Sequence, residues 1–263
     1  METIPAQVGG LFNLRDLGGY WTTGDASVRR NFIYRCGNLH HINTTGWETL
    51  REMGVSVIID FTSAGESRIF SGAAAEPEVP DWVQVIRIPF SDRPLCLDRE
   101  TEKYKGYRDA GNLAIAEQYL KTLQTKPGVI RQVLLCILAR QQSTILIHCA
   151  LGKDRTGIIS ALLLSLAGVP DPVVATEYSH SGPCLEHLRP RIIQLARATD
   201  PDVRDVAGLA TFSIQCSEEI MGSTLDLVKE NFGGVYEYVR DYCHLSVETI
   251  DEIKAALLTH PER

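Results

Sequence analysis

The stretch LIHCALGKDRTGIISALL, residues 146–163, passes from apolar to polar residues and back to apolar ones. It continues the run TILIH (144–148), whose apolar, β-branched character predicts a central strand covered on both faces. The residues after Arg155 predict a buried helix that ends at Gly168. A strand that leads through a tight loop into a helix directs backbone N–H groups at one point, where the helix dipole adds about half a positive charge. The stretch therefore predicts an oxyanion-binding loop in an α/β domain.

The residue types in this loop suit phosphate chemistry at a cysteine. Cys149 directly follows the strand, so we expect its sulfur at the bottom of the anion site, where the local field favours thiolate over thiol. Arg155 lies where the loop becomes a helix, and a guanidinium holds two phosphate oxygens at once. Thr156 places a hydroxyl within reach of the sulfur, where it could assist the departure of the sulfur in a second step. Gly152 permits a positive φ in the bend, and His148 could orient the loop through its ring nitrogens.

Most of the loop is expected to bind the phosphate, namely His148, Ala150, Leu151, Gly152, Lys153, Asp154 and Arg155. Two interpretations of the lysine stay open: a second phosphate-binding cation, or a solvated loop residue. The alternative for the whole loop is a buried, inert cysteine beside a helix-capping arginine, because a Cys followed six positions later by an Arg is a weak signal. The preceding strand and the apolar helix that follows favour the anion-binding interpretation.

Short β-branched runs alternate with helical patterns, which is typical of an α/β domain with a mostly parallel central sheet flanked by helices. The expected strands are residues 32–35, 55–60, 83–90 and 144–148. Residues 44–54 and 126–141 predict helices. From about residue 184 to the end we expect helices only. We interpret residues 1–263 as a single domain with a helical subregion at about 184–263, because no Pro-, Ser- or Gly-rich linker separates the two.

Composition limits the function classes. The 263 residues include 44% hydrophobic ones, and the formal net charge of -7 argues against the basic surface that nucleic acids require. Seven cysteines, an odd number without paired short spacing, favour a reducing compartment over a zinc site or a disulfide framework. The sequence does not begin with a basic stretch and an apolar run, so we expect neither a cleaved signal segment nor stable membrane insertion. These observations predict a cytoplasmic protein, with secretion without a recognisable signal left open.

The loop HCALGKDRTG (148–157) resembles the phosphate-binding loop of cysteine-dependent phosphatases, and specifically the atypical tyrosine phosphatase family typified by the mycobacterial tyrosine phosphatase B. NLRDLGGY (13–20), YRCGNL (34–39) and VIIDFTSAGE (57–66) are similar to further motifs of that family, and residues 232–258 are similar to its C-terminal helices. The resemblance covers nearly the whole chain. This chain departs from the family at Thr62, where an arginine is usual two residues after the aspartate that ends the strand.

Phosphoryl transfer to a thiolate also needs a proton for the leaving oxygen, which a carboxylic acid usually supplies. Asp92 follows an expected strand on a loop at the carboxyl end of the sheet, and it matches a family aspartate after the Pro-Phe step. Asp154 resembles a family aspartate near the substrate. Each also has a structural interpretation, Asp92 as a turn residue and Asp154 as a helix cap or ion-pair partner. Asp60 ends a neighbouring strand, and we interpret it as a buried partner of Arg15 or Arg35.

Charged groups near the predicted strands are expected to support the loop. These supporting residues are Arg15, Asp16, Arg35 and Asp60. We interpret them as an ion-pair network behind the loop, and direct contact with the substrate is the second interpretation.

The family resemblance implies a protein tyrosine phosphatase that hydrolyses phosphate monoesters through a cysteinyl-phosphate intermediate, with dual specificity left open. One alternative is a phosphoinositide or small-molecule phosphatase with the same mechanism, and a second is a non-catalytic module that binds a phosphorylated ligand. The expected partners are a phosphorylated protein or phosphoinositide, with phosphate, sulfate or vanadate in the loop, and no nucleic acid. We expect no metal and no other cofactor, because His40 and His41 have no accompanying acidic or cysteine ligands.

Overall fold

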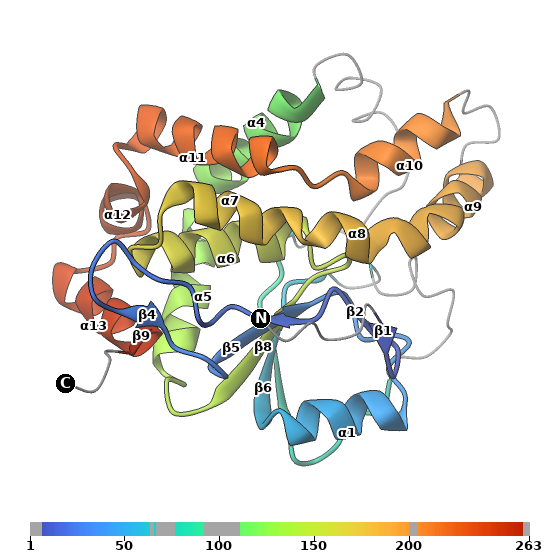
Figure 1. The fold of residues 1–263 in the computed structure, drawn as a ribbon, viewed down its shortest axis with the longest axis horizontal. Helices are drawn as coiled ribbons and strands as arrows, with labels where there is room; N and C mark the ends of the chain where they lie inside the picture. The colour runs from blue at the N-terminus through green and yellow to red at the C-terminus, as the bar shows by residue number, and fades with distance from the viewer. Residues whose placement is uncertain (1–6, 64–65, 67–76, 92–110, 200–204, 260–263) are drawn as a thin grey trace.

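A five-stranded sheet forms the centre of the computed structural model, which describes residues 7–63, 66, 77–91, 111–199 and 205–259 (Figure 1). The strand order is β3-β5-β8-β6-β7. β5, β8, β6 and β7 are parallel to one another, and β3 at one edge is antiparallel to β5. The strands span Arg15–Asp16 (β3), Ile33–Cys36 (β5), Val55–Asp60 (β6), Gln84–Arg87 (β7) and Thr144–His148 (β8). The predicted α/β class with a mostly parallel sheet is confirmed.

The carboxyl ends of three strands meet at one edge of this sheet. His148 at the end of β8 is the register partner of Cys36 on one side and of Asp60 on the other. The interior of β8 is fully buried, which explains its apolar residues, because neighbouring strands and two helical layers enclose it. Ligand crevices in open α/β sheets lie outside the carboxyl ends of the strands. The loops that follow these three residues therefore define the expected site.

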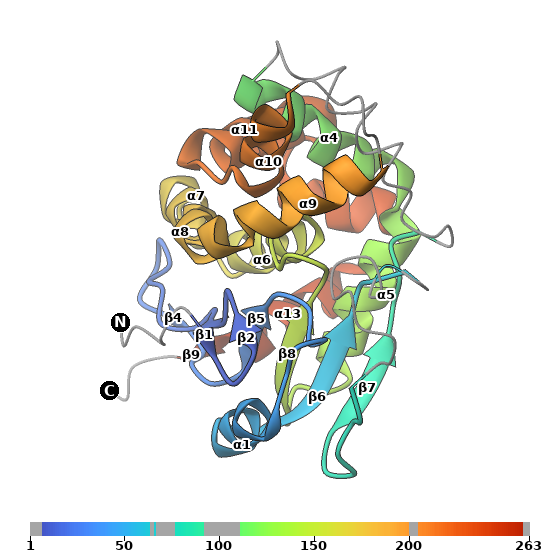
Figure 2. The same cartoon turned by 90° about the vertical axis from the view of Figure 1, so that its right-hand side faces the viewer.

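The two faces of the sheet pack against different helices. Ile58 and Leu146 belong to the core that includes Leu50 of helix α1 (Thr44–Glu52). Ile59 and Ile147, one position further along each strand, belong to a larger core on the opposite face, because successive side chains of a strand alternate between faces. Figure 2 shows α1 on one side of the sheet and the helices α6, α7 and α11 gathered on the other.

Six of the described helices build the larger layer. They are α4 (Gly111–Thr125), α5 (Pro127–Leu138), α6 (Asp154–Leu166), α7 (Asp171–Ser179), α11 (Glu218–Phe232) and α13 (Val247–Leu257). Helix α11 packs against both α4 and α7, and α13 packs against α5. Helix α6 is buried on all sides from Thr156 to Leu164, which is why its sequence is apolar without a polar stripe.

Four more of the described helices extend this layer beside the loop. They are α8 (Ser181–Leu185), α9 (Arg189–Thr199), α10 (Val206–Ile214) and α12 (Val235–Glu237), with a 3₁₀ turn at Glu186–Leu188 and a π-helical turn at Tyr238–Tyr242. Helices α9 and α10 pack against each other. Leu151 of the loop shares a small core with Leu185, Ile192 and Ile214, so this part of the chain is attached directly to the loop.

Three expectations about the elements need correction. The chain does not end in helices only, because β9 (Leu258–Thr259) pairs antiparallel with β4 (Ser27–Val28). Helix α4 was not predicted, since it follows a polar segment and begins at a glycine without a capping signal. Strand β7 ends at Arg87 rather than at residue 90. The remaining small sheet is the hairpin of β1 (Gln7–Val8) and β2 (Leu11–Phe12).

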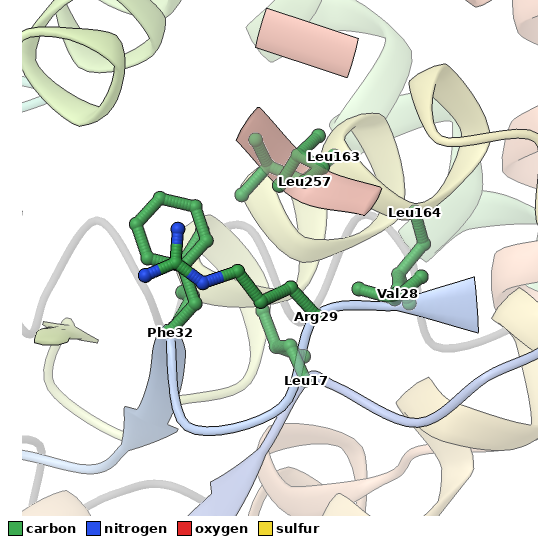
Figure 3. A pocket seen from close by; sticks show the side chains of 8 residues that line it. Leu17, Val28, Arg29, Phe32, Leu163, Leu164 and Leu257 are labelled. Atoms are coloured by element: carbon green, nitrogen blue, oxygen red, sulfur yellow. The ribbon is translucent and has the colours of Figure 1, made fainter. Parts of the chain in front are cut away.

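A small apolar pocket is lined by Leu163 and Leu164 near the end of α6, whereas the loop joins the start of that helix (Figure 3). Its lining includes Leu17, Val28, Phe32, Leu163, Leu164 and Leu257, all of which belong to the larger core. The guanidinium carbon of Arg29 lies 4.4 Å from the ring centroid of Phe32 beside it. The pocket lining includes no nucleophile and no acid, so it is not a candidate for phosphate chemistry.

Within the described ranges, none of the helices combines the length and apolar character needed to cross a bilayer.

Candidate active site

The loop of residues 149–153 joins the centre of the sheet to helix α6. Cys149 follows β8 directly and is 1% exposed. Gly152 has a φ of 65°, and a Cβ atom at this position would lie 2.2 Å from the carbonyl oxygen of Cys36. The bend therefore requires glycine for two reasons, the left-handed backbone and the close approach of β5.

Side chains behind the loop hold its carbonyl oxygens. The contacts are Asn38 Nδ2 to Ala150 O (2.8 Å), Asn13 Nδ2 to Leu151 O (3.1 Å) and Gly152 O (3.0 Å), and Arg35 Nη2 to Gly152 O (2.7 Å). The C=O and N–H groups of a trans peptide point in opposite directions. The N–H groups of residues 151–153 therefore point away from this support, and within the described ranges none of them donates a hydrogen bond. They are available to an anion.

Arg155 is held by Glu66, which comes from the segment after β6. Nη1 of Arg155 donates to Glu66 Oε2 at 2.8 Å and to Phe61 O at 3.1 Å, and Nη2 donates to the other carboxylate oxygen. The backbone N–H and hydroxyl of Ser63 also donate to Glu66, at 3.0 and 3.1 Å. Burial opposes the charge of Arg155, but the Cys149 sulfur and the Glu66 carboxylate outweigh it and raise the pKa of the guanidinium. Arg155 is thus a fixed, permanently charged group beside the sulfur.

Glu177 of α7 is the centre of a buried ion-pair network behind the loop. Its carboxylate accepts hydrogen bonds from Arg15 Nε at 2.7 Å and from Arg35 Nη1 at 2.6 Å. Arg15 also donates to the side chain of Asn13. Asn13 and Arg35 both donate to Gly152 O. The network therefore reaches the same loop carbonyl by two routes, through Asn13 and through Arg35.

Asp16 and Asp60 do not belong to this network. Asp16 accepts from Gly18 N at 2.8 Å and from Asn31 N at 3.0 Å, so it fixes a turn, because its side chain leaves β3 on the face opposite to that of Arg15. Asp60 is not the ion-pair partner of Arg15 or Arg35, because the carboxylate of Glu177 forms ion pairs with both guanidinium groups.

Asp60 instead connects the ends of β6 and β8. The N–H and hydroxyl of Thr62 donate to Asp60 Oδ1 at 2.8 and 2.7 Å, and His148 Nε2 lies 3.7 Å from the same oxygen. Arg87 Nε lies 3.6 Å from Oδ2. The other ring nitrogen of His148 lies 3.3 Å from Cys149 O. Thr62, where the family usually has arginine, therefore closes a local turn on Asp60.

The remaining loop residues have different environments. Lys153 is 3% exposed, and its ammonium donates to Ser213 O of α10 at 3.0 Å, so it is not a solvated loop residue. Asp154 is partly exposed and accepts a hydrogen bond from the Tyr119 hydroxyl at 2.5 Å. Thr156 is fully buried, and its hydroxyl has no hydrogen-bond partner among the described residues.

Several residues of the site carried no predicted role. Asp92, one of the two predicted candidates for the acid, lies outside the described residues. The residues without a predicted role are Asn13, Asn38, Glu66, Tyr119, Tyr178 and Glu177. The first three stand inside the motifs at 13–20, 34–39 and 57–66, which was a usable signal. Glu177 offers a weaker signal, an acidic residue in the interior of a helix segment that is otherwise suited to burial.

Glu177→Gln is expected to lower the free energy of unfolding by about 3 kcal/mol at pH 7, because it leaves two buried guanidinium groups without their counter-charge. Burial opposes ionisation of Glu177, but Arg15 and Arg35 outweigh it and hold the pKa of its carboxyl below the ordinary value. The stabilisation is therefore complete above the unfolded carboxyl pKa of about 4.3 and is lost as the pH falls through the lower folded value. Urea unfolding at pH 7 and in steps below about pH 4 measures both effects.

The control is Glu186→Gln, which removes the acid of an exposed pair with Arg189. We expect this variant to unfold like the wild type, because exposed ion pairs contribute little. Equal stability of Glu177→Gln and Glu186→Gln at pH 7 would contradict the central position assigned to Glu177.

The tyrosine phosphatase family model matches residues 6–259 of this chain. The Mycobacterium tuberculosis protein named triple specificity protein phosphatase PtpB is 24% identical over 93% of this chain and 99% of its own length. A tyrosine-protein phosphatase of Nostoc commune is 29% identical over 61% of this chain and 51% of its own length. The crystal structure of P. aeruginosa TpbA covers 80% of this chain and 97% of its own, with 16% identity and a TM-score of 0.34. Since the family match spans almost the entire sequence, the chain belongs to the tyrosine phosphatase family.

Proposed function

We propose that this tyrosine phosphatase hydrolyses phosphate monoesters in two steps, through a cysteinyl-phosphate on Cys149. The observation that carries the proposal is the fixation of the carbonyl oxygens of residues 150–152 from behind, which leaves the following N–H groups for the oxygens of a phosphoryl group. Preorganised donors of this kind stabilise the charge that develops in a transition state. Arg155 adds N–H groups beyond those that bind Glu66, because a guanidinium has five.

In the first step, the sulfur of Cys149 attacks phosphorus. The S–P bond forms, the bond from phosphorus to the ester oxygen breaks, and the leaving oxygen takes a proton from a carboxylic acid. Asp92 and Asp154 are the two candidates for this acid. The loop N–H groups and Arg155 hold the three equatorial oxygens throughout.

In the second step, water attacks the phosphorus of the cysteinyl-phosphate and the sulfur leaves as thiolate. Thr156 is proposed to donate its hydroxyl proton in a hydrogen bond to this sulfur. A buried hydroxyl without a partner is energetically unfavourable, so an acceptor that gains negative charge close to Thr156 would satisfy it.

Phosphotyrosine is the substrate we favour. Lys153 donates to Ser213 O and lies 3.4 Å from Asp154 Oδ1, so its ammonium is engaged and is not free for a second phosphate. This arrangement suits a substrate with one phosphate better than a phosphoinositide with several. Dual specificity is the second candidate, because the relative PtpB carries the name triple specificity protein phosphatase. We further propose one domain over residues 1–263 and a cytoplasmic location, where the six described cysteines, which are free thiols, would stay reduced.

A substrate panel tests this proposal. We expect the highest kcat/KM for phosphotyrosine peptides, lower values for phosphoserine and phosphothreonine peptides, and the lowest for vesicles that contain phosphoinositides. Activity should persist in EDTA, because the proposed nucleophile is a thiolate and not a metal-bound hydroxide. A higher kcat/KM for phosphoinositides than for phosphotyrosine peptides would overturn the substrate assignment. Loss of activity in EDTA with recovery on added metal would overturn the mechanism.

A further inference from the structure

The carboxylate of Asp154 is surrounded by a hydrogen-bond donor and positive charge. The Tyr119 hydroxyl of α4 donates to Asp154 Oδ1 at 2.5 Å, and Lys153 Nζ lies 3.4 Å from the same oxygen. Among the described residues, Arg155, Tyr178 and Cys216 also interact electrostatically with Asp154. A donor and nearby cations stabilise the ionised form of a carboxyl group over the protonated form.

The Tyr119 hydroxyl is a donor that keeps its proton. Tyr119 is 1% exposed, and burial together with the charge of Asp154 raises the pKa of its hydroxyl well above the ordinary value. The hydroxyl of Tyr178 lies 2.7 Å from that of Tyr119. Since the single hydroxyl proton of Tyr119 is directed at Asp154, Tyr178 must donate in this second hydrogen bond. The chain of donors therefore runs from Tyr178 through Tyr119 to the carboxylate.

Packing fixes both tyrosine rings. Their centroids are 6.1 Å apart and their planes cross at 79°, an edge-to-face contact between α4 and α7. The ring of Tyr178 also abuts α6, since a Cβ atom on Gly157 would lie 3.0 Å from two of its ring carbons. Three helices thus hold the Tyr119 hydroxyl at one place beside the first residue of α6.

We propose that Tyr119 is a positioning residue that holds Asp154 as the ionised carboxylate which accepts the water proton in the second step. This inference rests on the proposed two-step mechanism and deepens it, because it separates the roles of the two candidate acids. Asp154 is a base in this assignment, and the acid of the first step is a different group, for which Asp92 remains the candidate.

In the proposed second step, water attacks the phosphorus of the cysteinyl-phosphate, and a new O–P bond forms while the S–P bond breaks. The electron pair of the S–P bond returns to Cys149 as thiolate, and the proton of the attacking water moves to the carboxylate of Asp154. Inorganic phosphate leaves, and Asp154 returns its proton to solvent before the next turnover.

Stopped-flow kinetics with an aryl phosphate separates the two steps, because release of the phenol reports the first step as a burst and the steady state reports the second. For Tyr119→Phe we expect a burst rate constant within about twofold of the wild type. We expect the steady-state kcat to fall by about tenfold, which corresponds to one hydrogen bond to a charged group. The acidic limb of the pH profile of kcat should move to higher pH, because the carboxylate has lost a donor.

Tyr238→Phe is the matched control. The Tyr238 hydroxyl is also buried, and it donates at 2.9 Å to Leu123 O, a backbone group of the same helix α4. The control thus removes one buried tyrosine hydrogen bond to α4 without touching Asp154. We expect a lowered Tm of similar size in both variants, but wild-type burst and steady-state rate constants in Tyr238→Phe.

Three outcomes would overturn the inference. Unchanged kinetics in Tyr119→Phe would show that Asp154 does not depend on this hydroxyl. A parallel fall of both steps would show a structural role only, and a selective fall of the burst would make Asp154 the acid of the first step. Failure of the two-step mechanism is distinguishable, since the wild type would then show no phosphorylated Cys149 on acid quenching with labelled substrate.

Discussion

Cys149→Ser is expected to lower kcat for an aryl phosphate by on the order of 10⁴-fold or more, as deletions of the nucleophile do in other enzymes with covalent intermediates. A serine hydroxyl is neutral at pH 7 and is a weak nucleophile without a base to activate it. The site has no such base in contact with the sulfur among the described residues, where His148 approaches the carbonyl oxygen of Cys149 and Asp60 instead. Steady-state assays at pH 7 measure this loss.

Phosphate binding should survive the same substitution. The groups proposed to bind the anion are the loop N–H groups and Arg155, and the substitution changes neither. Removing a thiolate also removes its repulsion of the bound anion. We therefore expect inorganic phosphate to raise the Tm of Cys149→Ser at least as much as that of the wild type.

The control is Cys136→Ser, which changes a half-buried cysteine of α5. Its kcat should equal that of the wild type. Wild-type turnover in Cys149→Ser would end the proposal of a cysteinyl-phosphate. Loss of phosphate-induced stabilisation in that variant would instead contradict the anion-binding role of the loop.

The second large effect is expected for Arg155→Lys, with a loss of about 10² to 10³ in kcat/KM for an aryl phosphate, which is the usual cost of losing a transition-state donor. Lysine keeps the positive charge but is a point charge without the planar fork. In this protein the fork has two tasks. It forms the two-pronged pair with Glu66, and it is proposed to present its remaining N–H groups to the substrate.

Arg29→Lys is the matched control for this arginine. Arg29 lies over the ring of Phe32 beside the apolar pocket and donates to Gln141 O, and neither partner belongs to the loop. Its replacement should leave kcat/KM unchanged. Arg155→Lys with kcat/KM within about twofold of the wild type would contradict the forked arrangement as the source of catalysis.

The loop and the sheet class could be inferred from the sequence because their signals are local. Ten consecutive residues combine an apolar strand end, a cysteine, a glycine at a bend and an arginine at a helix start. Residues in this order strongly favour a backbone that passes from a strand through a tight bend into a helix. The strands Val55–Asp60 and Thr144–His148 were predicted with their observed bounds for the same reason, since a buried parallel strand is a continuous apolar run.

The partners of these residues could not be inferred. Asp60 and Glu177 are both acidic residues on elements next to the loop, and no periodicity tells which of them meets Arg15 and Arg35. The packing of α7 against α6 places Glu177 between the two guanidinium groups, while the register of β6 and β8 directs Asp60 to His148. Local sequence sets local backbone geometry, but the pairing of charges depends on contacts between distant segments.

Tyr119 shows this limit most clearly. Its helix was not predicted, and its hydroxyl meets Asp154 across 35 positions of sequence. The nucleophile, the bend and the arginine of the loop follow from consecutive residues, because chain connectivity alone brings them together. The groups that set the charge and direction of those residues come from segments far apart in the sequence, and their convergence exists only because burial of the apolar faces of the helices places them there.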